Sequence, residues 1–109
     1  MKSNSYERYK RLIDSSQVYD VADISPISRA NLLSKKLKNE ILLKREDLQP
    51  IFSFKIRGAY NKLAKLKKSG FSGSVIAASA GNHAQGVAYG AKSLKPVSYT
   101  HLRAHETTC

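Results

Sequence analysis

The apolar residues of the chain recur at spacings that alternate between those of helices and strands. In the first twenty residues, Tyr9, Leu12 and Ile13 fall on one face of a predicted helix. Helical spacing returns over residues 28–38, where three leucines repeat. The short apolar run at 41–43 then predicts a buried strand.

The second half of the chain repeats the order of strand and helix. Residues 53–68 start as the edge of a loop and continue as an amphipathic helix, which Gly70 is expected to end. The run at 75–78 predicts another buried strand, and small residues over 84–91 suit a helix packed closely on a sheet. This order predicts an α/β unit with parallel strands. Because two strands cannot make a parallel sheet with both faces covered, we expect the opening of a larger α/β domain.

Composition places the chain among globular proteins. Its 109 residues are 41% hydrophobic and 25% charged, which fits one folded domain and argues against disorder. No apolar run approaches the roughly 18 residues of a membrane helix, and the N-terminus lacks the apolar core of a secretory signal. The single cysteine, Cys109, cannot form an internal disulfide. We therefore expect a cytoplasmic protein with no membrane partner.

The charge of the chain raises an alternative from another class. Nineteen Lys and Arg against eight Asp and Glu give a net charge of +11, a balance typical of nucleic-acid-binding proteins. However, the lysines gather within two predicted helices, where a solvated face explains them, and no aromatic residues interleave with them as stacking platforms. We expect no nucleic-acid partner, and a small basic nucleic-acid-binding module stays as the alternative.

Lys55 is the first candidate for chemistry. It lies between Phe54 and Ile56, where a loop meets a predicted helix. Apolar neighbours and the positive end of the helix dipole both lower the pKa of a lysine, and a partly neutral lysine can form a Schiff base. A lysine that reaches from the helix start to water explains the same pattern.

The turn that leaves the second strand, residues 79–86, is the other candidate. Backbone N–H groups at a helix N-terminus bind anions, Ser79 and Asn82 add side-chain donors, and Gly81 permits close approach of a ligand. An ordinary N-cap formed by Asn82 or Ser79 fits the pattern equally well. We interpret His83 as a capping residue rather than as a general base.

Two motifs carry a specific resemblance. The stretch KREDLQPIFSFKIRGA at residues 44–59, followed by SAGNHAQG at 79–86, resembles the N-terminal part of the threonine ammonia-lyases, also called threonine dehydratases. These are pyridoxal-phosphate enzymes of the tryptophan-synthase-β fold type, fold type II. The similarity covers about residues 6–94 and implies an α/β fold in which helices flank a parallel sheet. Residues 1–95 would then be the N-terminal part of the catalytic domain.

The resemblance also implies a cofactor and site residues. Pyridoxal 5′-phosphate is the implied cofactor, and Lys55 matches the lysine that holds it and later acts as acid and base at Cα. Phe54 matches the residue packed beside the cofactor, and Asn82 matches the asparagine that hydrogen-bonds its phenolic oxygen. The loop that grips the substrate carboxylate is matched by Ser79, Ala80, Gly81, Asn82 and His83.

The reaction that the resemblance implies is β-elimination. L-threonine would lose its β-hydroxyl as water, and the enamine product would then be hydrolysed to 2-oxobutanoate and ammonia, the first step of isoleucine biosynthesis. The complete enzyme is expected to be a homo-oligomer that takes a small amino-acid substrate. An L-serine ammonia-lyase or a serine racemase of the same fold shares both motifs and stays as the near alternative.

Residues 96–109 depart from the family pattern. They show no strand pattern, and SYTHLRAHET resembles translated sequencing adapter, so we interpret them as a non-homologous, artefactual tail. HETTC at 105–109 resembles a zinc motif, but no apolar face or supporting shell accompanies it, so no metal site is expected. The family's phosphate cradle lies downstream, and we expect the 109-residue chain by itself to be inactive.

Overall fold

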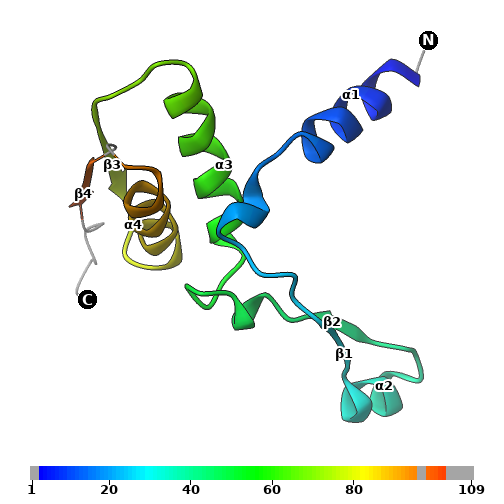
Figure 1. The fold of residues 1–109 in the computed structure, drawn as a ribbon. Coiled ribbons are helices and arrows are strands. Elements are labelled where there is room, and N and C mark those ends of the chain that lie inside the picture. The colour runs from blue at the N-terminus through cyan, green and yellow to red at the C-terminus, as the bar shows by residue number, and fades with distance from the viewer. Residues whose placement is uncertain (1–2, 96–97, 103–109) are drawn as a thin grey trace.

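The computed structural model describes residues 3–95 and 98–102. A body of two long helices and two parallel strands carries two projecting arms (Figure 1). One arm is the N-terminal helix, and the other is a pair of antiparallel strands joined by a short helix. In chain order, the elements are α1 (Ser3–Asp14), the 3-10 turn η1 (Val18–Asp20), β1 (Ile27–Arg29), α2 (Asn31–Leu37), β2 (Leu42–Lys44), the 3-10 turn η2 (Glu46–Leu48), α3 (Lys55–Lys68), β3 (Ser74–Ala78), α4 (Asn82–Leu94) and β4 (Ser98–Leu102).

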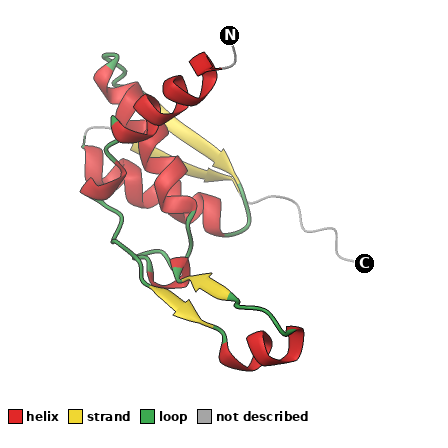
Figure 2. Cartoon of the chain, turned by 90° about the vertical axis from the view of Figure 1, so that its right-hand side faces the viewer, coloured by secondary structure: helices red, strands yellow, loops and turns green. Residues whose placement is uncertain are grey.

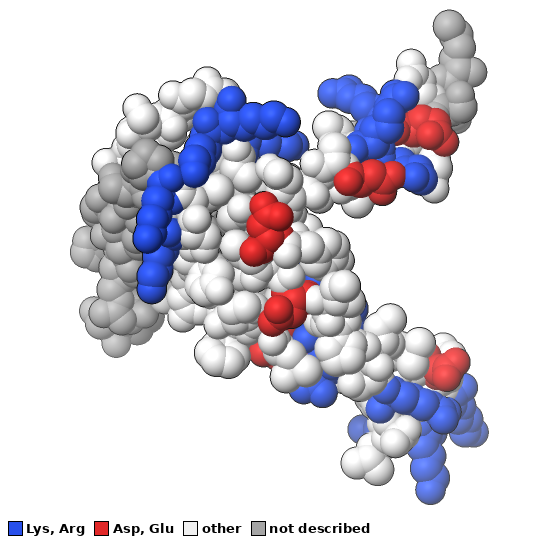
Figure 3. Space-filling model, in the orientation of Figure 1, with Lys and Arg blue, Asp and Glu red and all other residues white. Residues whose placement is uncertain are grey.

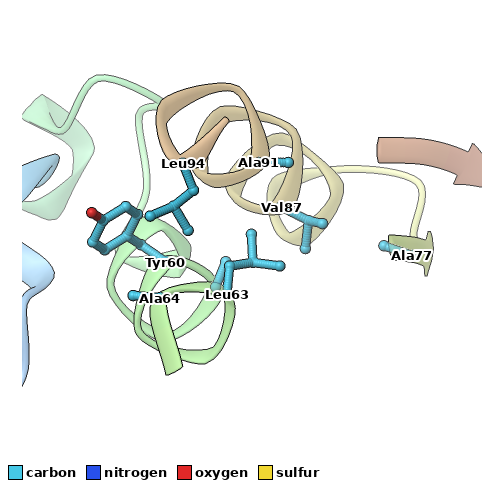
Figure 4. Close-up of a cluster of buried hydrophobic side chains, with 8 residues drawn as sticks. Tyr60, Leu63, Ala64, Ala77, Val87, Ala91 and Leu94 are labelled. Carbon is cyan, nitrogen blue, oxygen red and sulfur yellow. The ribbon is translucent and has the colours of Figure 1, made fainter. Parts of the chain in front are cut away.

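The core of the body lies between α3 and α4. These helices lie side by side next to the β3–β4 pair (Figures 1 and 2). Their facing residues are buried together with one residue of β3 (Figure 4). The cluster consists of Ala59, Tyr60, Leu63, Ala64, Ala77, Val87, Ala91 and Leu94. Burial of an aliphatic side chain of this kind contributes about 1.5–3 kcal/mol, so this interface is the main source of stability in the body.

The end of α3 shows why the sequence stops the helix there. Gly70 has a φ of 89°, a left-handed conformation that glycine adopts without steric cost. The N–H of Gly70 donates to the carbonyl of Lys67, and the N–H of Phe71 donates to that of Leu66. This is a Schellman motif, which satisfies carbonyls left free at a helix end. The predicted helix, its end at Gly70, the strand at 75–78 and the helix over 84–91 are therefore confirmed. The expected burial of the strand is wrong, because only Ala77 of β3 is buried and Ile76 is exposed.

The helix expected over residues 28–38 is wrong at its start. The chain first forms β1, and α2 begins only at Asn31. The N–H of Ala30 donates to the carbonyl of Ile41, so pairing with the returning chain holds this segment extended. The helical spacing of the leucines is a local signal. It does not show that residues 27–29 pair with residues 42–44, which follow the helix. Lys38, with a φ of 49°, ends α2 in a left-handed turn.

The strand expected at 41–43 exists, but its predicted surroundings are wrong. β2 pairs antiparallel with β1, with Ile27 opposite Lys44 and Arg29 opposite Leu42. Its residues are exposed, and it belongs to a different sheet from β3. The parallel pairing in the described chain is that of β3 with β4, from Ser74↔Ser98 to Ala78↔Leu102.

β4 also corrects the expectation that residues 96–109 contain no strand. The open edge of β3 offers backbone N–H and carbonyl groups, and residues 98–102 pair with it regardless of their weak apolar pattern. The zinc-like HETTC sequence at 105–109 lies outside the described residues. Within the described part of the chain, no helix combines the length and apolar character needed to cross a membrane.

We predict that the 109-residue chain self-associates in solution. Large apolar side chains are exposed at many positions from α1 to α4, including Ile24 at 83%, Leu32 at 88% and Phe52 at 78%. Extensive exposed apolar surface drives association. Sedimentation velocity should show species larger than a monomer, and a dye that binds apolar surface should fluoresce. The double variant Ile24→Thr with Leu32→Lys should associate less, whereas a monomeric parent that leaves the dye dark would contradict the prediction.

Candidate active site

Lys55 is the first residue of α3, as the sequence predicted. Its Nζ lies 5.3 Å from the centroid of the Phe54 ring, a cation–π contact. The expected apolar enclosure of the lysine is absent, because the side chains of Lys55 and Phe54 are both exposed. Ile56, in contrast, is fully buried and anchors the first turn of the helix. The structure thus holds the helix start firmly while leaving the amine accessible.

The loop before α3 is anchored through Gln49. This side chain is 1% exposed, and its amide makes two hydrogen bonds with the backbone of Asp23. The N–H of Asp23 donates to Oε1 at 2.8 Å, and Nε2 donates to the carbonyl of Asp23 at 2.7 Å. A buried amide that lost these partners would leave unsatisfied polar groups, each costing about 1–3 kcal/mol. The loop that leads to Lys55 is therefore tied to the segment after η1.

An ion pair holds the first turn of α3 from the same side. Nε and Nη2 of Arg57 donate to the two carboxylate oxygens of Glu46 at 2.9 and 2.8 Å. Oγ of Ser25 also donates to this carboxylate, and the ring of Tyr19 lies 5.2 Å from the guanidinium carbon. The hydrogen bonds from Arg57 lower the pKa of Glu46 to about 2, and the same pairing raises the pKa of Arg57. This network was missed from the sequence, although its members Glu46, Gln49 and Arg57 lie within the motif at 44–59.

The turn between β3 and α4 begins the second motif. Oγ of Ser79 accepts a hydrogen bond from the N–H of Gly81 at 3.2 Å, and Gly81 is the N-cap of α4. The N-cap position is occupied by Gly81, so the interpretation that Asn82, Ser79 or His83 is the N-cap residue is wrong. Asn82 and His83 are exposed at the helix start. The first N–H groups of a helix have no carbonyl partner within it, which leaves an anion-binding end at this turn.

His83 lies beside the body as well as at the helix start. It lines a groove together with Gly58 and Lys62 of α3 and Val75 of β3. Gly58 lies three residues after Lys55, so this groove borders the first turns of both helices. The structure therefore brings His83 next to the helix that starts at Lys55.

Gly86 brings the two motifs into direct contact. A Cβ built at this position would lie 3.0 Å from the carbonyl oxygen of Lys55 and 3.1 Å from Cβ of Ala59. α4 therefore packs on the backbone of the lysine itself. Gly86 ends the motif at 79–86, so the sequence marked this residue. Periodicity does not show which helix Gly86 faces.

The comparisons with known proteins agree with this arrangement. A family model described as pyridoxal-phosphate dependent enzyme matches residues 19–104. The mitochondrial threonine dehydratase of Saccharomyces cerevisiae is 55% identical over 95 residues, which are 87% of this chain and 16% of that protein. The chloroplastic biosynthetic threonine dehydratase 1 of Solanum lycopersicum is 58% identical over 86 residues, 79% of this chain and 14% of that protein. A solved structure of threonine deaminase isoform 2 from Solanum lycopersicum superposes with a TM-score of 0.81 at 44% identity, covering 93% of this chain and 28% of that one.

These matches identify the chain as a member of the pyridoxal-phosphate-dependent enzyme family with the fold type that the motifs predicted. Within that family, its similarity is to threonine dehydratases, and it spans 16% of the yeast relative and 14% of the tomato relative. The family match reaches residue 104, beyond the predicted boundary at residue 95. That boundary and the origin of residues 96–109 stay predictions.

The described residues fit the cofactor of this family at its reactive end. Oγ of Ser53, two positions before Lys55, is buried without a hydrogen-bond partner, so a polar group remains to be satisfied there. A Cβ at Gly81 would have no atom within 4 Å, so the turn leaves open space for a ligand. An accessible lysine amine can react with the cofactor's aldehyde. An exposed asparagine amide can donate a hydrogen bond to its phenolic oxygen.

We predict that Glu46→Gln destabilises the fold by about 1–3 kcal/mol near neutral pH, the scale of a lost hydrogen-bonded charge. The pKa of Glu46 is about 2 in the fold against an ordinary value of 4.5, so its ion pair stabilises above pH 4.5 and loses its effect as the pH falls toward 2. Urea midpoints of parent and variant should therefore converge over this range.

The host for this test is a full-length hybrid, in which residues 6–94 replace the aligned segment of the tomato threonine deaminase. Asp47→Asn is the matched control, because its pair with Arg45 is exposed and should contribute less. A difference between parent and Glu46→Gln that stays constant down to the lowest pH would contradict the assignment.

Proposed function

We propose that this chain supplies the lysine and the substrate-carboxylate loop of an enzyme that converts L-threonine to 2-oxobutanoate and ammonia. The observation that carries the proposal is the packing of α4 on the backbone of Lys55. It brings the helix that starts with the reactive lysine next to the helix whose N-terminus follows the turn at 79–81. The similarity to threonine dehydratases supports threonine as the substrate.

Each residue then has a defined task. Pyridoxal phosphate, when bound, supplies an electron sink for the bond that breaks at Cα of the amino acid. The amine of Lys55 would hold the cofactor at its aldehyde and would serve as acid and base for the proton at Cα of the amino acid. The amide of Asn82 would donate to the cofactor's phenolic oxygen, and Phe54 would pack beside the cofactor. The β-hydroxyl would leave as water, and hydrolysis of the enamine product would release ammonia and 2-oxobutanoate.

The turn at 79–83 is proposed to hold the substrate carboxylate. The starting N–H groups of α4 carry the positive end of the helix dipole, which attracts an anion. Ser79, Ala80, Gly81, Asn82 and His83 line this end of the helix. The open space at Gly81 permits a carboxylate to approach the backbone.

The basic charge of the chain does not favour nucleic-acid binding. On the face shown in Figure 3, Lys and Arg lie in separate groups over the body and the two arms, with Asp and Glu between them. Some lysines serve internal contacts: Nζ of Lys67 donates to the carbonyls of Leu94 and Lys95, and Nζ of Lys44 donates to that of Ser25. Family membership, rather than a nucleic-acid module, accounts for the motifs.

The cellular setting and assembly stay proposals. We expect the complete enzyme to be a homo-oligomer that serves isoleucine synthesis. The cytoplasmic location is a prediction from sequence, and the relatives include enzymes named as mitochondrial and chloroplastic. An L-serine ammonia-lyase or serine racemase is the alternative within the fold, and parallel assays with L-threonine and L-serine decide between them.

We predict that Lys55→Ala in the hybrid lowers 2-oxobutanoate release from L-threonine by about a thousandfold or more, because no other group replaces the amine. Borohydride reduction followed by peptide mass mapping should find cofactor on Lys55 in the parent. Lys68→Ala, an exposed lysine at the other end of α3, is the matched control and should retain turnover. Cofactor reduced onto another lysine, with turnover intact in Lys55→Ala, would refute the assignment.

A further inference from the structure

Two glycines one turn apart on α4 face α3. Gly86 and Gly90 are both buried, and each lies close to residues of α3. Glycine inside a helix costs about 1 kcal/mol relative to alanine. Each position therefore weakens α4 by itself, and the packing against α3 must explain why no side chain stands there.

The two positions differ in what a side chain would meet. At Gly86 a Cβ would lie 3.0 Å from the carbonyl oxygen and 3.2 Å from the carbonyl carbon of Lys55. At Gly90 it would lie 2.9 Å from Cδ1 of Leu63, the far end of a flexible side chain, and 3.5 Å from the nearest backbone atom. Leu63 can change rotamer, whereas a carbonyl within a helix cannot move without its residue.

The contacts around Lys55 hold the first turn of α3 in place, so this turn cannot shift as a unit. Arg57 is held by both carboxylate oxygens of Glu46, and the preceding loop is held by the buried amide of Gln49. Ile56 is fully buried. A side chain at position 86 would therefore displace the backbone of Lys55 itself. Because this residue carries the amine, the displacement would also move the amine.

We propose that Gly86 is a positioning residue that sets where Lys55 presents its amine. It touches neither substrate nor cofactor, and it acts through the backbone of the lysine. The inference rests on the proposed function, since it gives the lysine a reaction geometry to maintain. A purely structural role would predict only a loss of stability shared by both glycines.

The test compares Gly86→Ala with Gly90→Ala in the full-length hybrid. Melting is measured without cofactor, and the labelling of Lys55 is measured by incubation with limiting pyridoxal phosphate, borohydride reduction and peptide mass mapping. Gly86→Ala should lower the yield of labelled Lys55 about tenfold, the change that a 1.4 kcal/mol penalty produces. Gly90→Ala should label Lys55 like the parent, and the turnover number should fall in Gly86→Ala alone.

A further variant protects the test against simple unfolding. Gly86→Ala with Ala59→Gly removes the 3.1 Å contact to Ala59 but keeps that to the Lys55 carbonyl. Ala59→Gly alone is the reference for this variant, because the new glycine in α3 has its own cost. Against that reference the double variant should lose less melting temperature than Gly86→Ala loses against the parent, while still labelling Lys55 poorly. Parent-like labelling in Gly86→Ala, or an equal loss in both single-glycine variants, would overturn the inference. A parent hybrid that labels no Lys55 would overturn the proposed function and this inference together.

Discussion

Close contact between α3 and α4 is the constraint on which the rest of the structure depends. The two helices form most of the buried core, and at Gly86 α4 packs directly on the backbone of the first residue of α3. Because that residue is Lys55, the packing falls on the residue to which the proposed function assigns the chemistry. Of the two glycines of α4 that face α3, Gly86 is the one at which a Cβ would press on backbone, and that backbone belongs to the start of α3.

The network around Glu46 completes the arrangement from the other side. It joins the loop after η1, the turn η2 and the first turn of α3 through the carboxylate of Glu46 and the amide of Gln49. Charged hydrogen bonds in a half-buried setting are stronger than neutral ones, which suits them to fix a helix start. Lys55 thus has a rigid backbone and an accessible amine, the combination that a lysine needs to hold a carbonyl ligand.

The sequence predicted those elements whose signals are local. Periodicity and Gly70 located α3, and the short apolar runs and small residues located β3 and α4, because each signal lies within the element itself. β1 and β4 were missed because a short strand depends on the backbone edge it pairs with. The motifs named the candidate residues, yet the groove that His83 lines and the contact of Gly86 depend on how two helices pack. No pattern along a single helix contains that information.

Amide hydrogen exchange in the full-length hybrid tests the central claim most directly. If contact between the helices fixes the lysine, the amides at the first turns of α3, around Ala59, and those in the middle of α4, around Val87, open as one cooperative unit. Their opening free energies should agree and should fall together in Gly86→Ala. A first turn of α3 that exchanges rapidly while α4 stays protected would show that the lysine is held independently of this contact, and it would contradict the account.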